Sequence, residues 1–185
     1  MKTLSLNILD IVQNSIRAKA TAISIIITES ISGDLFTIKV QDNGRGIKAE
    51  LLDNITDPFV TTRTTRNIGM GLSLLKYHAN ITGGDLSISS EINKGTTVIA
   101  TFSHSHFDRQ PLGDIAGVVT ILIAANPGIE FNYIHKTDEG EYSFSTLETK
   151  KFLEIGILNG YELLNMIGTM ISGNLKEICV SDITR

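Results

Sequence analysis

Asp10, Asn14 and Arg17 stand at helical spacing near the start of the chain, in the stretch DIVQNSIR. At about 100° per residue, Asn14 lies roughly 40° round a helix from Asp10 and Arg17 about 20° to the other side. A carboxylate can act as a general base, an amide oxygen suits a hard cation such as Mg²⁺, and a guanidinium pairs with phosphate. The alternative is that these residues form a solvated polar face of the helix without any chemical role.

A second group of residues with chemical potential is Asp42-Asn-Gly44-Arg-Gly46-Ile47. It follows an alternating stretch, residues 35–42, that predicts a strand. An aspartate at the end of a sheet can accept a hydrogen bond from an exocyclic amine, and the glycines allow a flat ring to pack closely. A simple β-turn is the alternative.

The third group, Gly69-Met70-Gly71-Leu72, stands directly at the start of a predicted helix. Glycines at a helix N-terminus let backbone N–H groups approach a phosphate, and the helix dipole favours the anion. Glycine also begins helices for purely steric reasons, so this signal gains meaning only beside the other two.

The elements that must position these residues can be predicted from hydrophobic periodicity. The first helix carries an apolar stripe: Leu4, Ile8, Leu9, Val12 and Ile16. Strands are expected over 22–30, 35–42, 85–92 and 96–103, with helices over 48–54 and from Met70 to Ile81, where Gly83 and Gly84 follow. After a linker at 104–113, we expect a helix over 113–125, a hairpin over 129–147, and helices over 148–155 and 161–178. This order fits an α+β sandwich in which helices cover one face of a sheet.

Composition narrows the class of protein. The chain has 185 residues, 42% of them hydrophobic, a net charge of −4 and a pI near 5.5. No chain-wide basic field would recruit nucleic acid or an anionic membrane. The single cysteine, Cys179, forms no internal disulfide, and the most apolar late segment, 115–125, is too short to span a bilayer. We therefore expect a cytoplasmic protein without nucleic-acid partners or a membrane segment.

Taken together, the three groups resemble the GHKL superfamily of ATP-binding domains, which includes gyrase B, heat-shock-90 chaperones, histidine kinases and MutL ATPases. The segments DIVQNSIRAKATAISIIIT and IKVQDNGRGI look most like the N box and first glycine box of the MutL branch. The segment from DPFVTTRTTRN through GMGLSLLKYHANITGG to KGTTVIATF looks like the lid and second glycine box of histidine kinases and anti-sigma-factor serine kinases. The resemblance implies a Bergerat-type fold over residues 1–105, a small α+β extension over 106–185, and ATP and Mg²⁺ as cofactors.

The resemblance also implies a role for each site residue. At the adenine end, Asp42 would bind the amino group, Thr96 would support the base through its hydroxyl, and the pocket would be shaped by Gly44, Gly46 and Ile47. At the phosphate end, Asn14 would hold Mg²⁺, Arg17 would lie near the phosphates, and the triphosphate would be lined by Gly69, Met70, Gly71 and Leu72. The ATP lid would consist of Phe59 and residues 61–67, with Arg63 or Arg66 reaching the γ-phosphate.

The acid at position 10 affects which reaction with ATP the protein would catalyse. Members that hydrolyse ATP usually carry glutamate there, and aspartate withdraws the carboxylate by about 1–1.5 Å, a misplacement that can cost on the order of a hundredfold in rate. Asp10 nevertheless keeps the chemical type of a base. A histidine acceptor needs little base assistance, so an acid here fits serine-kinase or ATPase chemistry better.

Three functions remain open at this point. No histidine lies on a dimerisation helix before the N box, so we expect a stand-alone kinase-type module of bacterial signalling that acts on a separate protein. The alternative is a slow ATPase or an ATP-gated switch without a phosphoacceptor, and a module that only senses ATP is a third reading. A homodimer through residues 106–185 is a further expectation. A metal site at His104, His106 and Asp108 is disfavoured, because these residues lie in the predicted linker.

Overall fold

Six strands form one mixed sheet in a computed structural model that describes residues 3–52 and 70–181. The strand order is β3-β4-β2-β1-β5-β6. The strands are β1 (Ala22–Ser30), β2 (Leu35–Asp42), β3 (Leu86–Glu91), β4 (Gly95–Ser103), β5 (Glu130–Lys136) and β6 (Glu141–Ser145). The helices are α1 (Leu4–Arg17), α2 (Ala49–Leu52), α3 (Met70–Ile81), α4 (Ile115–Ala125), α5 (Thr146–Leu153) and α6 (Tyr161–Glu177).

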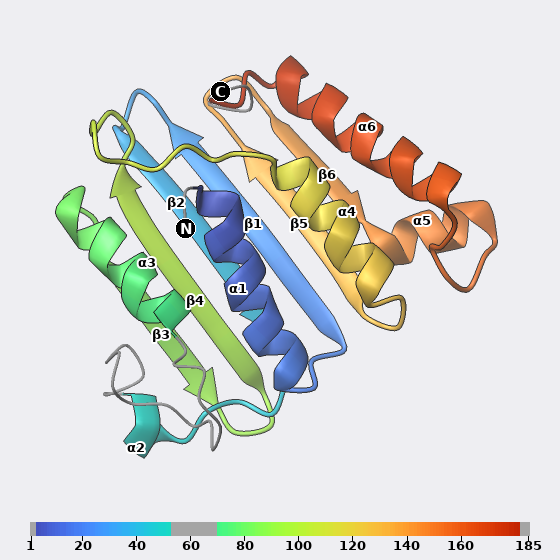
Figure 1. Ribbon diagram of the computed structural model, residues 1–185, viewed down its shortest axis with the longest axis horizontal. Helices are drawn as coiled ribbons and strands as arrows, with labels where there is room; N and C mark the ends of the chain where they lie inside the picture. Colours follow the sequence, from blue (N-terminus) through green and yellow to red (C-terminus); the bar gives the residue numbers. More distant parts are fainter. Residues whose placement is uncertain (1–2, 53–69, 182–185) are drawn as a thin grey trace.

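Helices α3, α1, α4 and α6 lie side by side across one face of this sheet (Figure 1). The burial of β1 alternates accordingly: Ile23, Ile25 and Ile27 are buried, and the residues between them are half-buried. Alternation of this kind marks a strand with one face against a core. The predicted α+β sandwich, a mixed sheet covered on one face by helices, is confirmed.

The register of the sheet brings the end of β2 to a defined place. In the antiparallel ladders, Asp42 lies opposite Ile23 of β1 on one side and Thr96 of β4 on the other. Asp42 therefore sits where three neighbouring strands begin or end, next to the C-terminal end of α1.

Residues 106–181 extend the same sheet. Strand β5 pairs parallel to β1, and β6 pairs antiparallel to β5 at the outer edge. The preceding linker is fixed to α1, because the N–H groups of Leu4 and Ser5 donate to the carbonyls of Pro111 and Leu112, both at 2.9 Å. The linker thereby satisfies backbone donors that the first turn of a helix otherwise leaves free.

Two local details differ from the sequence-based expectation. In α1, Ile11 is buried although it is outside the predicted stripe, whereas Leu9 and Ile16 are half-buried. Helix α1 has a helical neighbour on each side, so its buried arc is wider than the face turned to the sheet (Figure 1). Helix α5 begins at Thr146, two residues earlier than predicted, because the Ser145 hydroxyl caps it by accepting from the N–H of Glu148.

Candidate functional site

Asp42 is held at the end of β2 by three hydrogen bonds. The Ser15 hydroxyl donates to Oδ2 at 2.6 Å, and the N–H groups of Gly44 and Thr96 donate to Oδ1 at 2.8 and 3.3 Å. The side chain is nearly buried, with 9% of its residue surface exposed. An ionised carboxylate offers about four acceptor positions, so this fixed group can still accept a hydrogen bond from a ligand.

The loop after Asp42 is packed tightly against its neighbours. Gly46 has φ +70°, and a Cβ built there would lie 2.1 Å from the carbonyl oxygen of Glu91. Gly44 approaches Ala18 at the end of α1, whose carbonyl also accepts from the N–H of Arg45 at 2.9 Å. Only glycine fits the backbone at position 46, which gives the DNGRG pattern a steric reason.

A chain of hydroxyls joins this loop to β3 and β4. Ser90 accepts from the N–H of Ile47 at 2.8 Å, donates to the Gly95 carbonyl at 2.8 Å, and lies 2.9 Å from the Thr96 hydroxyl. The structure thus brings Ile47 and Thr96 to the same corner of the molecule as Asp42.

The polar face of α1 lies beside the start of α3. Asp10, Asn14 and Arg17 are all exposed, and Arg17 Nη1 donates to Asn14 Oδ1 at 3.1 Å. A Cβ built on Gly71 would lie 3.0 Å from Asp10 Oδ2, so the carboxylate is directly against the first turn of α3. The N–H groups of that turn, including those of Gly71 and Leu72, have no partner within the helix and can bind an anion.

Four of the predicted site residues, Phe59, Arg63, Arg66 and Gly69, lie outside the described residues, as do 61–67. Met70 opens α3. The lid and its arginines therefore stay a prediction.

Sequence reasoning missed Ser15 and Ser90. Ser15 is 4% exposed and falls at a buried position of α1, three residues after Val12 and four after Ile11. A serine in an apolar stripe signals a polar partner, because a buried hydroxyl must be hydrogen-bonded. Ser90 gave a weaker signal, because it stands between Ser89 and Glu91 at the polar end of β3.

A second polar cluster occupies the opposite end of β1. Glu29 is 2% exposed and accepts from Ser181 N–H at 3.2 Å, from the Ser181 hydroxyl, and from His135 Nε2 at 2.8 Å. Burial raises the pKa of Glu29, but the hydrogen bonds from His135 and Ser181 and the charge on His135 outweigh it, and the pKa falls below its usual value of 4.5.

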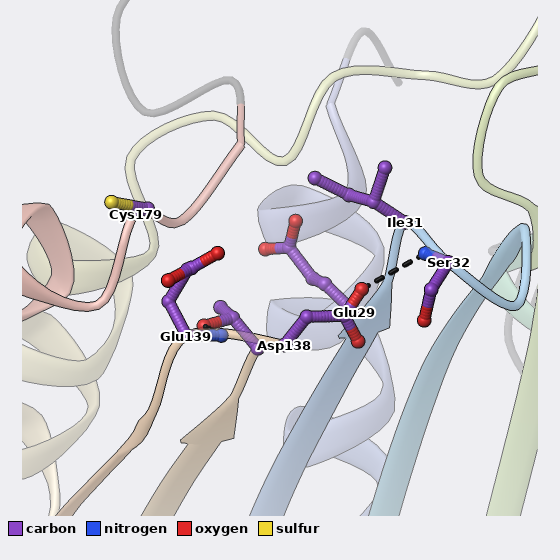
Figure 2. Close-up of a pocket in the computed structure, with 7 residues that line it drawn as sticks. Glu29, Ile31, Ser32, Asp138, Glu139 and Cys179 are labelled. Carbon is purple, nitrogen blue, oxygen red and sulfur yellow. Dashed lines mark hydrogen bonds between the residues drawn. The ribbon is translucent and has the colours of Figure 1, made fainter.

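Beside this cluster lies a pocket of about 390 Å³ that contains none of the predicted site residues. Figure 2 shows Glu29, Asp138 and Glu139 around it, with the N–H of Ser32 donating to Asp138 Oδ2 at 2.9 Å. Its full lining is Glu29, Ile31, Ser32, Thr137, Asp138, Glu139 and Cys179. Over residues 3–52 and 70–181, no group of three or more histidine, cysteine, aspartate or glutamate residues is arranged to hold a metal ion.

Comparison with known proteins places residues 2–106, which include Asp42 and its hydrogen-bond partners, in a family. Residues 2–106 match the family described as "Histidine kinase-, DNA gyrase B-, and HSP90-like ATPase". The chain is 31% identical over 99 residues to an uncharacterized sensor-like histidine kinase of Rhizobium meliloti, which is 51% of this chain and 19% of that protein. It is 45% identical over 64 residues to sporulation kinase D of Bacillus subtilis, covering 35% of this chain and 12% of the kinase.

Sensor histidine kinase ZraS of Escherichia coli is 34% identical over 90 residues, covering 49% of this chain and 19% of ZraS. The chain thus spans less than a fifth of the length of these relatives. Among solved structures, the N-terminal domain of a DNA repair protein is similar, with a TM-score of 0.56 and 23% identity over 79% of this chain and 53% of that one. That likeness concerns the fold alone. In the described part of the chain, no helix is both long and apolar enough to cross a membrane.

Proposed function

The chain belongs to the family of histidine kinase-, DNA gyrase B- and HSP90-like ATPases, and we propose that it is a Mg-ATP-dependent, kinase-type module that phosphorylates a separate protein. ATP binding by residues 2–106 follows from membership of the family. The identity of the reaction, the metal and the acceptor are the parts that we propose.

The anchored carboxylate of Asp42 is the observation that carries the proposal. It is fixed by Ser15, Gly44 and Thr96 yet retains acceptor capacity, which suits a hydrogen bond from the adenine amino group. Gly44, Gly46 and Ile47 would form the floor under the ring. The Thr96 hydroxyl would support the base together with its partner Ser90.

The phosphates would lie between α1 and the first turn of α3. There the amides of Gly71 and Leu72 would bind phosphate oxygens, with Asp10 within reach of the attacking group. The short distance between Asp10 and Gly71 supports a role of Asp10 as general base for a serine or a water nucleophile.

The Asn14 oxygen fits Mg²⁺, which in nucleotide sites takes few protein oxygens and completes its shell with phosphates and water. When bound, the ion would neutralise charge on the triphosphate. Asn14 Oδ1 now accepts from Arg17, so metal binding would free the guanidinium to pair with phosphate instead.

A kinase is favoured over the alternative by the named kinases among the relatives, which match between 64 and 99 residues of this chain. The alternative, a slow ATPase or ATP-gated switch, is favoured by a different observation. Pro111 and Leu112, which lie between β4 and α4, accept hydrogen bonds from the N-terminus of α1, so a nucleotide-driven shift of α1 would reach the C-terminal part.

We also propose that the two parts of the chain have different functions. Residues 1–105 would bind ATP, and residues 106–185 would contact the partner or a second copy of the chain. A cytoplasmic location is part of the proposal and agrees with Cys179 being free and exposed.

Purified protein with Mg-[γ-³²P]ATP and a bacterial cell extract tests the proposal. Free phosphate and labelled protein would be followed for the wild type, Asp10→Asn and Asn14→Ala, with Asp85→Asn as an exposed-carboxylate control. Label on another protein that is lost in Asp10→Asn and Asn14→Ala, but retained in Asp85→Asn, supports the kinase. Phosphate release without label supports the ATPase, and tight ATP binding with neither product identifies a sensor.

A further inference from the structure

The outer edge of the sheet presents unpaired backbone groups. In the hairpin, the N–H of Thr137 donates to the carbonyl of Gly140 at 2.8 Å. Because hydrogen-bonded and non-hydrogen-bonded pairs alternate along an antiparallel ladder, Tyr142 is then bonded to β5, whereas the N–H and C=O of Glu141 and Ser143 point outward. In the described part of the chain, no strand pairs with β6 on that side.

Helix α6 runs alongside this edge, beyond the last strand (Figure 1). Gly168 packs against Thr120 of α4, with 3.1 Å from an ideal Cβ to Oγ1. Met166 and Met170 each lie about 160° round the helix from Gly168. They are therefore on the flank turned away from α4, beyond β6, and they are 69% and 43% exposed.

The segment after β6 adds more exposed apolar surface. Phe152, at the end of α5, is 87% exposed and Tyr161, at the start of α6, is 80% exposed. Together the two rings leave on the order of 300 Å² uncovered. Other exposed apolar residues in this stretch are Leu147, Leu153, Ile155 and Ile157.

Acidic residues outnumber basic residues in this region. Residues 137–177 contain seven acidic and three basic residues, a net charge of −4 that equals that of the whole chain. Of the seven acidic residues, Glu141 is paired with Lys136 at 2.9 Å, and of the three lysines, Lys150 is paired with Glu130 at 2.9 Å. A ligand of this surface is therefore expected to carry positive charge.

From this juxtaposition we infer that β6 and the outer flank of α6 bind an extended, basic and apolar peptide of a partner protein, which adds a strand to the sheet. Main-chain hydrogen bonds to Glu141 and Ser143 would supply affinity, and alternate apolar side chains would reach the methionines, which adapt to varied shapes. A second copy of the chain is a poor occupant: strands lie about 4.8 Å apart and helices 8–10 Å apart, so α6 of each copy would overlap the helices over the other's sheet.

The inference deepens the proposed function by naming the chemistry of the partner, and it rests on that function only for what happens after binding. Peptide binding is therefore measured without nucleotide, so that it can fail or succeed independently of the kinase reaction.

The probe is a fluorescein-labelled peptide of eight residues in which lysine alternates with valine, and a glutamate–valine peptide is its charge control. Binding is followed by fluorescence anisotropy. Ser143→Pro removes an outward N–H that the sheet does not use, a position where proline is tolerated, whereas Ser143→Ala keeps it. Met166→Lys adds a positive charge on the apolar flank, and Asn165→Lys adds the same charge on the neighbouring exposed position.

We expect the lysine–valine peptide to bind the wild type, Ser143→Ala and Asn165→Lys alike, and to bind Ser143→Pro and Met166→Lys at least tenfold more weakly. Thermal unfolding should be similar for all five proteins, and Met166→Lys carries the test if Ser143→Pro fails to fold. Equal binding of the glutamate peptide, no binding of either peptide, or equal binding by all variants would overturn the inference. Concentration-dependent self-association in sedimentation velocity that Ser143→Pro abolishes would overturn it in favour of a second copy.

Discussion

Two buried carboxylates lie at opposite ends of the antiparallel pair of strands β1 and β2, and their hydrogen-bond partners differ. Glu29, near the end of β1, accepts from His135, from Ser181 twice, and from His104 at 3.4 Å. Among the described residues, Asp42, at the end of β2, accepts from one side chain, Ser15, and from two backbone N–H groups.

The difference shows how a buried carboxylate that only stabilises the fold can be distinguished from one that can bind a ligand. Glu29 has its acceptor capacity filled by four hydrogen bonds from three segments of the chain, and the C-terminal segment covers it. Asp42 is oriented, but it faces a loop of glycines rather than further donors. A fixed group with spare hydrogen-bonding capacity is suited to a ligand, because no reorganisation is needed when the ligand arrives.

Asp42→Asn is the largest expected effect on function. The substitution removes the negative charge of the group that would accept from the adenine amino group, so ATP should bind with a free energy about 2–3 kcal/mol weaker, or roughly 30- to 150-fold in Kd. Isothermal titration calorimetry with Mg-ATP measures it. Unchanged affinity would show that Asp42 does not contact the nucleotide.

Glu29→Gln should give the opposite pattern. Removing one partner of a buried charged network should lower the free energy of unfolding by about 3 kcal/mol, while ATP affinity stays within twofold of wild type. Denaturant titration measures the loss, and Glu139→Gln, an exposed carboxylate at the same pocket, is the control.

The pH dependence of this variant sharpens the comparison. The pKa of Glu29 in the folded protein is below its usual 4.5, so ionised Glu29 stabilises the fold above about pH 4.5 and loses that effect as pH falls through the folded-state pKa. The wild type should therefore lose stability on acidification more steeply than Glu29→Gln. Parallel curves for the two proteins would contradict this account.

Gly46→Ala tests the tight loop beside Asp42. Gly83 also has positive φ, +78°, but has open space around its Cβ position, whereas a Cβ at Gly46 meets the Glu91 carbonyl. Gly83→Ala should cost about 1 kcal/mol from the left-handed backbone alone, and Gly46→Ala roughly 2 kcal/mol more. Similar unfolding temperatures of the two variants would mean that the loop can shift at little energetic cost to make room for a Cβ at position 46.

Ser15→Ala is the smallest of these effects. The loss of one hydrogen bond to the Asp42 carboxylate should weaken ATP binding by about 1 kcal/mol, close to fivefold. Ser87→Ala, an exposed serine on β3, is the matched control. Equal affinities would show that the backbone donors alone orient Asp42.

Much of the fold was predictable from local pattern. The isoleucine-rich stretch 22–30 and the alternating stretch 35–42 coincide with β1 and β2 to the residue, because a strand against one helical layer must alternate. The joining of β5 to β1 was not predictable, since a parallel pairing across about 100 residues leaves no local trace.

The glycines and charged residues of the candidate site could be predicted from the sequence. The glycines mark positions with a special backbone geometry, and the charged residues Asp10 and Arg17 fall on one face of a predicted helix. Glu29 was missed because a lone glutamate near the end of a strand is usually solvated; only the fold brings His104, His135 and Ser181 to it. Ser15 acquired meaning for the same reason, once the register had placed Asp42 beside it.

The central claim is that nucleotide binds at the Asp42 end of the sheet and not at the Glu29 end. Backbone ¹H–¹⁵N NMR spectra recorded while a non-hydrolysable Mg-ATP analogue is added test this in one experiment. We predict that the amide signals of Gly44, Thr96 and Gly71 shift and saturate together, while those of His135 and Ser181 stay in place. Shifts centred on Ser181 and His135, with none at Gly44 and Thr96, would contradict the account.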